Sequence, residues 1–223
     1  MTSTATRITV YTRTTGYRHE SIEAGVECVA GAGPARGLAV RHTEDPDELT
    51  RLLPESDAVV FLSTSGNVLT AAGREALRAH TAAGRGFVGV HAAACTEYDW
   101  PFYEELLGAW FDGHPELQPG TAVVEDAAHP AMAHLQDRWD FVDEWYNFRA
   151  NPRPRVRVLA TADESSYEGG GMGADHPLVW CHERLGGRVF YTGLGHTRES
   201  FRDPAFARHL LGAVAWAARV TRD

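Results

Sequence analysis

The chain has 223 residues, of which 43% are hydrophobic and 10% aromatic, so it has a globular composition and can bury a sizeable core. Its formal net charge is -9 and its basic residues are spread along the chain, so no basic patch indicates nucleic acid or an anionic membrane as a partner. All 21 basic residues are Arg, which excludes Schiff-base lysines, pyridoxal-phosphate enzymes and Walker-type nucleotide loops. We therefore expect one domain over residues 1–223, a small-molecule partner, and neither pyridoxal phosphate nor a nucleotide as cofactor.

The cysteine pattern and the N-terminal composition indicate a compartment. Cys28, Cys95 and Cys181 are odd in number and far apart, which offers neither a disulfide framework nor a CxxC metal or redox motif. The N-terminal residues 1–6 are polar, and no apolar run is long enough to cross a bilayer. We therefore expect an unexported, cytoplasmic protein with reduced thiols and no membrane partner.

The first half of the chain alternates strands with helices. Strands are predicted at 7–12, 38–42, 58–62 and 86–90. Apolar residues recur at helical spacing between Ile22 and Ala30, which predicts a helix after the first strand. Thr70 caps a second, Ala-rich helix that stops at Gly84. Strands that are apolar on both faces and alternate with helices indicate a mostly parallel sheet that is covered on both sides.

The second half carries strand candidates with few helices between them. They lie at 121–125, 139–148, 155–161, 177–182 and 188–192. We expect them to extend the sheet as antiparallel additions, and an amphipathic helix at 205–218 closes the chain. The predicted fold class is therefore α/β, a doubly wound and mostly parallel sheet with antiparallel additions in a three-layer sandwich.

Three histidines follow predicted strands. His19 comes after the first strand, His91 ends the strand at 86–90, and His196 follows the last strand. Ligands of open parallel sheets bind outside the carboxyl ends of the strands. A lone histidine at such a place is more often a satisfied polar residue, but three at equivalent strand ends favour proton transfer or metal ligation.

Two further segments combine carboxylates with aromatic rings. In a strand over 143–148, Glu144 and Tyr146 share one face and Asp143 the other, so only one carboxylate can point into a site. The segment 96–101 carries Tyr98, Asp99 and Trp100. The alternatives are a half-buried strand with aromatic core residues for the first segment and, for the second, a helix start that Asp99 caps.

The remaining histidines and Cys95 receive smaller roles. His91 stands where hydrolases of the strand-turn-helix type expose a nucleophile, which excludes a Ser or Cys nucleophile there. Cys95 lies four residues further on and is expected to be a small core residue. His114 and His176 lie in loops and are either ligands or turn residues. The others are treated as structural or solvated: His42, His80, His129, His134, His182 and His209.

Five segments occur in an order that resembles the ThuA-like, or trehalose-utilisation, family. They are residues 11–19, 86–93, 98–100, 143–146 and 193–196. The resemblance implies a class I glutamine amidotransferase-like, flavodoxin-like fold, with His91 in place of the amidotransferase cysteine and hence no glutaminase activity. It also implies a part in sugar catabolism and a polar pocket at His19, His91, Glu144 and His196, with Asp99 and His114 nearby.

We weigh two catalytic mechanisms for this pocket. In the favoured one, Glu144 and the histidines act as general acid and base on a sugar or keto-sugar. Tyr98, Trp100 and Tyr146 stack on the ring, and Asp99, His114 and Arg198 complete the predicted substrate-binding set. In the alternative, His19, His91 and His196, with or without Glu144, hold a divalent metal such as zinc in a hydrolase, lyase or isomerase. The long sequence spacing offers no local motif for that metal.

A different class of function also stays open. The chain can be a noncatalytic sugar-binding or regulatory module that kept the fold without the nucleophile. A homodimer through an aromatic surface at Trp110 and Phe111 is a further alternative, which core packing explains equally well.

Overall fold

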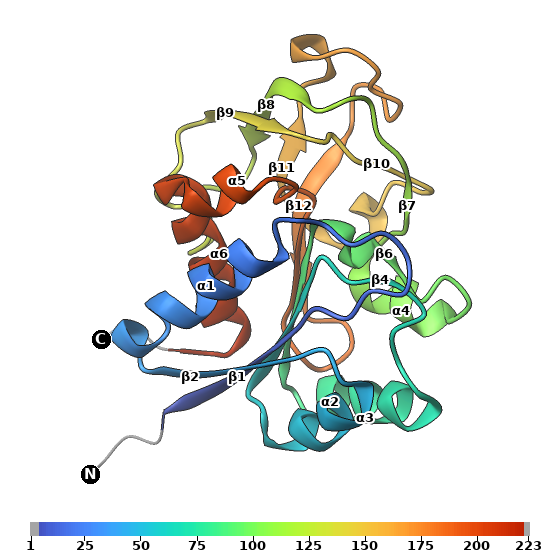
Figure 1. Cartoon of the computed structure of the whole chain (residues 1–223). Helices are drawn as coiled ribbons and strands as arrows, with labels where there is room; N and C mark the ends of the chain where they lie inside the picture. The colour runs from blue at the N-terminus through green and yellow to red at the C-terminus, as the bar shows by residue number, and fades with distance from the viewer. Residues whose placement is uncertain (1–4, 221–223) are drawn as a thin grey trace.

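The computed structural model describes residues 5–220 and folds them into three layers around a nine-stranded sheet (Figure 1). The strands lie side by side in the order β2-β1-β3-β5-β13-β12-β11-β8-β9. Their bounds are β1 Thr6–Tyr11, β2 Leu38–Thr43, β3 Ala58–Leu62, β5 Gly86–Val90, β8 Gln118–Val124, β9 Arg138–Asp143, β11 Arg157–Ala162, β12 Pro177–His182 and β13 Val189–Thr192. Of the polar N-terminal stretch, residues 1–4 lie outside the described part of the chain.

The sheet is parallel on one side and antiparallel on the other. Neighbouring strands from β2 to β13 pair in parallel, and those from β13 to β9 pair antiparallel. The predicted fold class is thereby confirmed. The expectation that every strand of the second half adds antiparallel is wrong for β13, which runs parallel to β5. All four of its residues are buried, as a strand in the middle of a covered sheet requires.

Helices cover both faces of the sheet (Figure 1). On one face lie α1 (Ile22–Ala32), α5 (Arg198–Arg202) and α6 (Pro204–Ala217), and on the other lie α2 (Pro46–Leu52), α3 (Ala71–Ala82) and α4 (Pro101–Leu107). Thr70 caps α3 as predicted, because its hydroxyl accepts the amide of Gly73. Each face buries its own apolar cluster, one centred on residues such as Val214 and the other on residues such as Leu107.

Short elements extend beyond the carboxyl ends of the parallel strands. β4 (Ser65–Gly66) pairs with β6 (Cys95–Thr96), and β7 (Phe111–Gly113) pairs with β10 (Asn147–Phe148). Single 3-10 turns lie at Pro34–Arg36, Leu53–Glu55, His91–Ala94, Arg153–Arg155 and Glu164–Ser166. The β4–β6 and β7–β10 pairs and the turn at His91–Ala94 form the rim on which the candidate site is built.

The strand predicted over 139–148 is interrupted. β9 ends at Asp143, and β10 begins only at Asn147. Asp143 is paired with Gln118, the first residue of β8, so the chain beyond it has no ladder partner and leaves the sheet. The predicted continuous strand over 139–148 is therefore wrong. The predicted division of the two carboxylates nevertheless matches the structure, because Glu144 and Tyr146 line the cavity described below and Asp143 does not.

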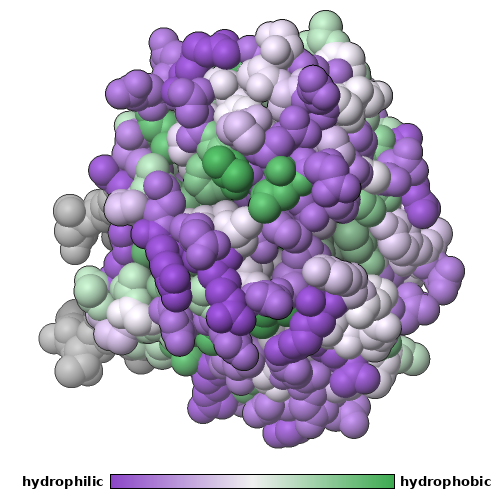
Figure 2. All heavy atoms as spheres, turned by 45° about the horizontal axis from the view of Figure 1, so that its top comes forward, coloured by the Kyte–Doolittle hydropathy of each residue, from purple (hydrophilic) through white to green (hydrophobic). Residues whose placement is uncertain are grey.

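The surface is mostly hydrophilic on the face seen in Figure 2, with a small hydrophobic patch near its centre. The large hydrophobic side chains that are exposed among the described residues are Tyr17, Leu117 and Val142. Trp110 is buried and Phe111 half-buried, so this pair does not form the exposed aromatic surface considered for a homodimer. Within residues 5–220, no helix has both the length and the apolar character that a bilayer crossing requires.

Candidate functional site

A cavity of about 540 Å³ opens at the carboxyl ends of the parallel strands, where the topology leads us to expect a ligand. Four stretches of chain supply its walls: the loop after β1, the β4–β6 ladder, the β7 region, and the segment that follows β9. The residues that line it are Gly16, Tyr17, His19, Ser65, Gly66, Ala92, Cys95, Tyr98, Phe111, His114, Glu144 and Tyr146.

His91 lies beneath this cavity at the sharp end of β5. Its side chain is fully buried. Its backbone has a φ of 49°, in the left-handed region, which produces the sharp turn directly after β5. Its Nδ1 lies 2.7 Å from the carbonyl oxygen of Gly193 and donates its proton there, so the lone pair of neutral His91 resides on Nε2. The ring is thereby oriented with an acceptor nitrogen toward the other histidines.

Three more side chains converge on this nitrogen. His91 Nε2 lies 3.2 Å from His19 Nε2, 3.3 Å from His196 Nδ1 and 3.6 Å from Glu144 Oε2. His196 Nδ1 is also 3.0 Å from the same carboxylate oxygen. One ligand atom from each of these four residues lies within 4.8 Å of all the others. His19 and His91 are buried, and Glu144 and His196 are partly exposed.

These separations fit a divalent metal ion. Ligands at about 2.0–2.1 Å from a tetrahedral zinc ion are roughly 3.3–3.4 Å from each other. Three imidazole nitrogens and one carboxylate oxygen form a donor set typical of zinc and of other first-row divalent ions. The bond from His91 to the Gly193 carbonyl matches the second interaction that metal-bound histidines make. The residues present therefore fit such an ion.

The charge states of the cluster agree with ligation. Burial and the neighbouring histidines lower the pKa of His19 to about 3, so its ring is neutral at pH 7. Burial acts to raise the pKa of Glu144, but the neighbouring His196 and His91 outweigh this effect and hold the pKa well below its ordinary value. Burial acts to lower the pKa of His196, but the hydrogen bond to Glu144 and the negative charge of Glu144 outweigh this effect, so the pKa is raised. A metal would thus meet one ionised carboxylate, that of Glu144.

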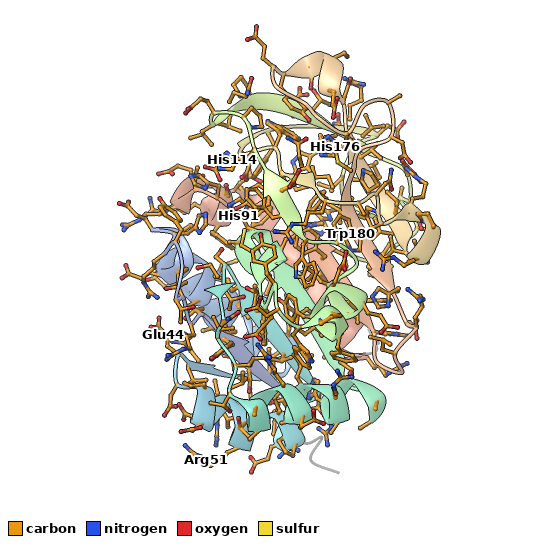
Figure 3. All side chains as sticks on the ribbon, turned by 90° about the vertical axis from the view of Figure 1, so that its right-hand side faces the viewer. Glu44, Arg51, His91, His114, His176 and Trp180 are labelled. Carbon is orange, nitrogen blue, oxygen red and sulfur yellow. The ribbon has the colours of Figure 1, made fainter. Side chains whose placement is uncertain are left out.

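His114 and Tyr146, both predicted to bind substrate, line the cavity next to this cluster. His114 Nδ1 donates to the carbonyl of Pro115 at 2.8 Å, which leaves Nε2 3.6 Å from Glu144 Oε2. The Tyr146 ring packs against His91 at 4.2 Å between centroids and stacks on His114 at 5.7 Å. Figure 3 shows His114 above His91 in the upper half of the molecule, with Arg51 at the opposite end.

Of the other predicted substrate-binding residues, some line the cavity and others do not. Tyr98 lines the cavity, although its hydroxyl donates to the carbonyl of Phe111. Trp100 does not line the cavity and packs instead beneath the guanidinium groups of Arg74 and Arg78.

Asp99 and Arg198 also lie outside the cavity lining. The Asp99 carboxylate accepts the Asn67 amide, and Arg198 donates to the carbonyl of Glu20. Asp99 does not cap α4, since the residue before that helix is Trp100 and its start has no side-chain cap.

The cavity also contains residues that the sequence analysis missed. Tyr17 and Phe111 supply aromatic walls, and Cys95, expected in the core, is part of the lining. Burial raises the pKa of Cys95 to about 12, so its thiol is neutral and a poor nucleophile. The sequence signal for Tyr17 was its place two residues before His19, in a loop that follows a strand.

The remaining histidines are structural, but several are buried rather than solvated. His80, His182 and His209 are buried and contact backbone carbonyls. His176 is also fully buried and bonds to the carbonyl of Tyr146 and to Glu164, so it supports the cavity wall from behind.

A larger groove of about 830 Å³ lies between β8, β9 and the start of α5. It is mostly apolar, with Leu117 and Val142 on one side and Glu199 on the other, and none of the described residues that line it is a histidine or cysteine. The smaller cavity, in contrast, is lined by His19 and Glu144 of the histidine cluster.

Several solved structures are similar to this chain over nearly its whole length. A ThuA-like protein from Bacteroides uniformis shares 25% identity with a TM-score of 0.78, covering 97% of this chain and 93% of that one. A ThuA-like protein from Parabacteroides merdae shares 19% identity with a TM-score of 0.81, covering 98% and 92%. A β-galactosidase from Rahnella sp. R3 shares the fold at 16% identity and a TM-score of 0.60, with 97% of this chain and 32% of that one covered.

The structural neighbours support the flavodoxin-like, glutamine amidotransferase-like fold predicted from the sequence. No match was found among curated proteins. The family model described as trehalose utilisation matches residues 7–217. The chain therefore belongs to the ThuA family.

Proposed function

We propose that the chain is a metal-dependent enzyme of carbohydrate catabolism that acts on a neutral sugar or keto-sugar as a hydrolase, isomerase or lyase. The observation that carries the proposal is the convergence of four ligand atoms, from His19, His91, Glu144 and His196, within 4.8 Å of one another. These residues would hold a divalent cation such as zinc. When bound, such an ion polarises a carbonyl oxygen or lowers the pKa of a water molecule.

The geometry favours this mechanism over acid–base chemistry by the histidines alone. Two imidazole nitrogens, His19 Nε2 and His196 Nδ1, approach the lone pair of His91 at 3.2 and 3.3 Å. Imidazole nitrogens at this spacing can donate their lone pairs to one divalent cation. This arrangement could not be predicted from sequence spacing, because His19, His91 and His196 follow three different strands, β1, β5 and β13.

His114 is the residue that we assign to proton transfer. Its Nε2 lies 3.6 Å from Glu144 Oε2, and its side chain is 34% exposed at the cavity. Its Nδ1 is engaged by the Pro115 carbonyl, which fixes the orientation of the ring. A group held in this way can take a proton from a substrate or return one to it.

The cavity walls support a neutral, ring-shaped substrate. Tyr17 and Phe111 offer exposed or half-exposed rings, Tyr146 supports the wall from beneath, and among the described residues that line the cavity none is an Arg. A phosphate or carboxylate would find no cationic side chain there, whereas a sugar combines stacking faces with hydroxyl groups. Membership of the trehalose utilisation family supports the same class of substrate.

Metal content tests the proposal. Tag-free wild-type protein, purified without chelator, should contain about one divalent ion per chain, and His91→Ala should contain none because its Nε2 contacts all the other ligand atoms. His114→Ala is the matched control. It removes a cavity histidine outside the ligand set, so it should keep the metal and lose turnover of the sugars and keto-sugars screened with the wild type.

Two results would redirect the proposal. Wild-type protein without metal, even after it is supplied with zinc or manganese, would contradict the metal centre and favour acid–base chemistry by Glu144 and the histidines. Metal-loaded protein that binds sugars without converting them would instead favour a binding or regulatory module.

A further inference from the structure

Asp143 is a fully buried carboxylate directly behind the histidine cluster. Its two oxygens accept the backbone amides of Gly195 at 2.8 Å, Glu144 at 2.9 Å and His196 at 3.1 Å. The hydroxyl of Ser200 adds a longer contact at 3.4 Å. Every donor is uncharged, and every bond uses the carboxylate as the acceptor.

These donors come from two separate segments of the chain. Glu144 follows β9, whereas Gly195 and His196 lie in the turn after β13. One buried side chain therefore binds both segments that carry the partly exposed ligands of the cluster.

We infer that Asp143 is a positioning residue for two ligands of the proposed metal centre, Glu144 and His196. The inference rests on the proposed function, and it concerns a residue that does not itself reach the ligand atoms.

The positioning role follows from which amides Asp143 binds. Two of them belong to Glu144 and His196, the two ligands that are partly exposed and are not fixed by burial. Gly195, the third donor, has a φ of 120°, and a side chain at this position would meet Val90. The turn that carries His196 thus lies where it does because a glycine allows the backbone conformation and Asp143 binds its amides.

The test is zinc affinity rather than turnover. Metal-free wild type and Asp143→Asn are titrated with Zn²⁺ by calorimetry, and the Tm of each is measured with and without the ion. The Asn variant keeps the shape, but its NH2 group cannot accept a backbone amide as the second carboxyl oxygen does, so its Kd for Zn²⁺ should rise about 10- to 100-fold and zinc should raise its Tm less than in wild type. Asp140→Asn is the matched control on the same strand, exposed and bonded to Thr121, and it should bind zinc as wild type does.

The outcomes separate the two claims. Zinc affinity of the wild-type level in Asp143→Asn, together with a lower Tm of the metal-free variant, would mean a purely structural role and would overturn the inference alone. Wild-type protein that binds no zinc would overturn the proposed function and the inference with it.

A second variant covers the case in which Asp143→Asn does not fold. Ser200→Ala removes the side-chain donor to Asp143 and leaves the carboxylate in place. Because the hydroxyl contact is long, we expect a smaller rise in the Kd for Zn²⁺, about two- to fivefold. If only this variant folds, an unchanged Kd overturns the inference.

Discussion

Tyr17 is the most exposed aromatic residue of the cavity, with 68% of its surface open. Its ring stands edge-on to His19 at 4.8 Å between centroids. The loop that carries it is fastened to the β4 segment, since the Ser65 carbonyl accepts the amides of Thr15 and Gly16 and the Ser65 hydroxyl donates to Tyr17. A solvent-facing ring that a fastened loop carries at the mouth of a cavity is suited to stack on a sugar ring.

Replacement of Tyr17 tests this role. For a sugar that the screen identifies as a ligand, Tyr17→Ala should raise the Kd about 2- to 10-fold, because stacking contributes about 0.5–1.5 kcal/mol. Tyr17→Phe keeps the ring and should bind with nearly the wild-type Kd, and both variants should keep their metal. Equal Kd values for the Ala and wild-type proteins in calorimetry would remove Tyr17 from the binding site.

At the scale of elements, the candidate site depends on turns that helices hold in place. α5 and α6 follow the turn that carries His196, and they join at Asp203. Asp203 caps α6, since its carboxylate accepts the amides of Ala205 at 2.9 Å and Phe206 at 2.8 Å, and Pro204 occupies the first helical position. α6 in turn packs against the middle of the sheet.

The cap predicts a stability effect that leaves the metal site alone. Asp203→Ala should lower the free energy of unfolding by about 1 kcal/mol, which for a chain of this length lowers the Tm by roughly 2–4 °C. Asp203→Asn can still accept the amides and should lose much less. Urea unfolding of the three proteins measures the effect, and a loss of zinc affinity in Asp203→Ala would show that the helix start and the site are more closely coupled than we expect.

At the scale of the whole molecule, buried histidines make stability depend on pH. Burial lowers the pKa of five of them, to about 3 for His209 and about 4 for His129. The others are His19, His80 and His182. In the unfolded chain each would titrate near 6.5, so below that pH the unfolded state binds protons that the folded state does not. Stability contributed by these neutral rings is present above pH 6.5 and falls as the pH drops toward their folded-state values.

Acid should therefore destabilise the metal-free protein steeply. Each such histidine lowers the free energy of unfolding by about 1.4 kcal/mol per pH unit below 6.5. His209→Gln removes one titrating ring and keeps a donor for the Ala131 carbonyl, so its stability should fall less steeply with acid than that of the wild type. Urea unfolding at pH 7.5, 6.5 and 5.5 in the presence of chelator measures both slopes. Parallel curves for the two proteins would mean that His209 does not contribute.

Much of the fold could be predicted from local patterns. The buried strands β3 and β5 have the predicted bounds, because continuous apolar runs between turn residues identify strands covered on both faces. The elbow at His91 was visible as a histidine directly after such a strand. The break after Asp143 was not visible, since it depends on where the partner strand β8 begins.

The sequence by itself determined the layered α/β fold, the family and the identity of four polar residues at strand ends. Only the tertiary structure decided what these residues form together. His19, His91, Glu144 and His196 are separated by at least 50 residues along the chain, and their ligand atoms come within 4.8 Å because parallel strands end at one edge of the sheet. Sequence spacing reports local geometry alone, whereas a site assembled from several strand ends depends on strand order, which the sheet as a whole determines.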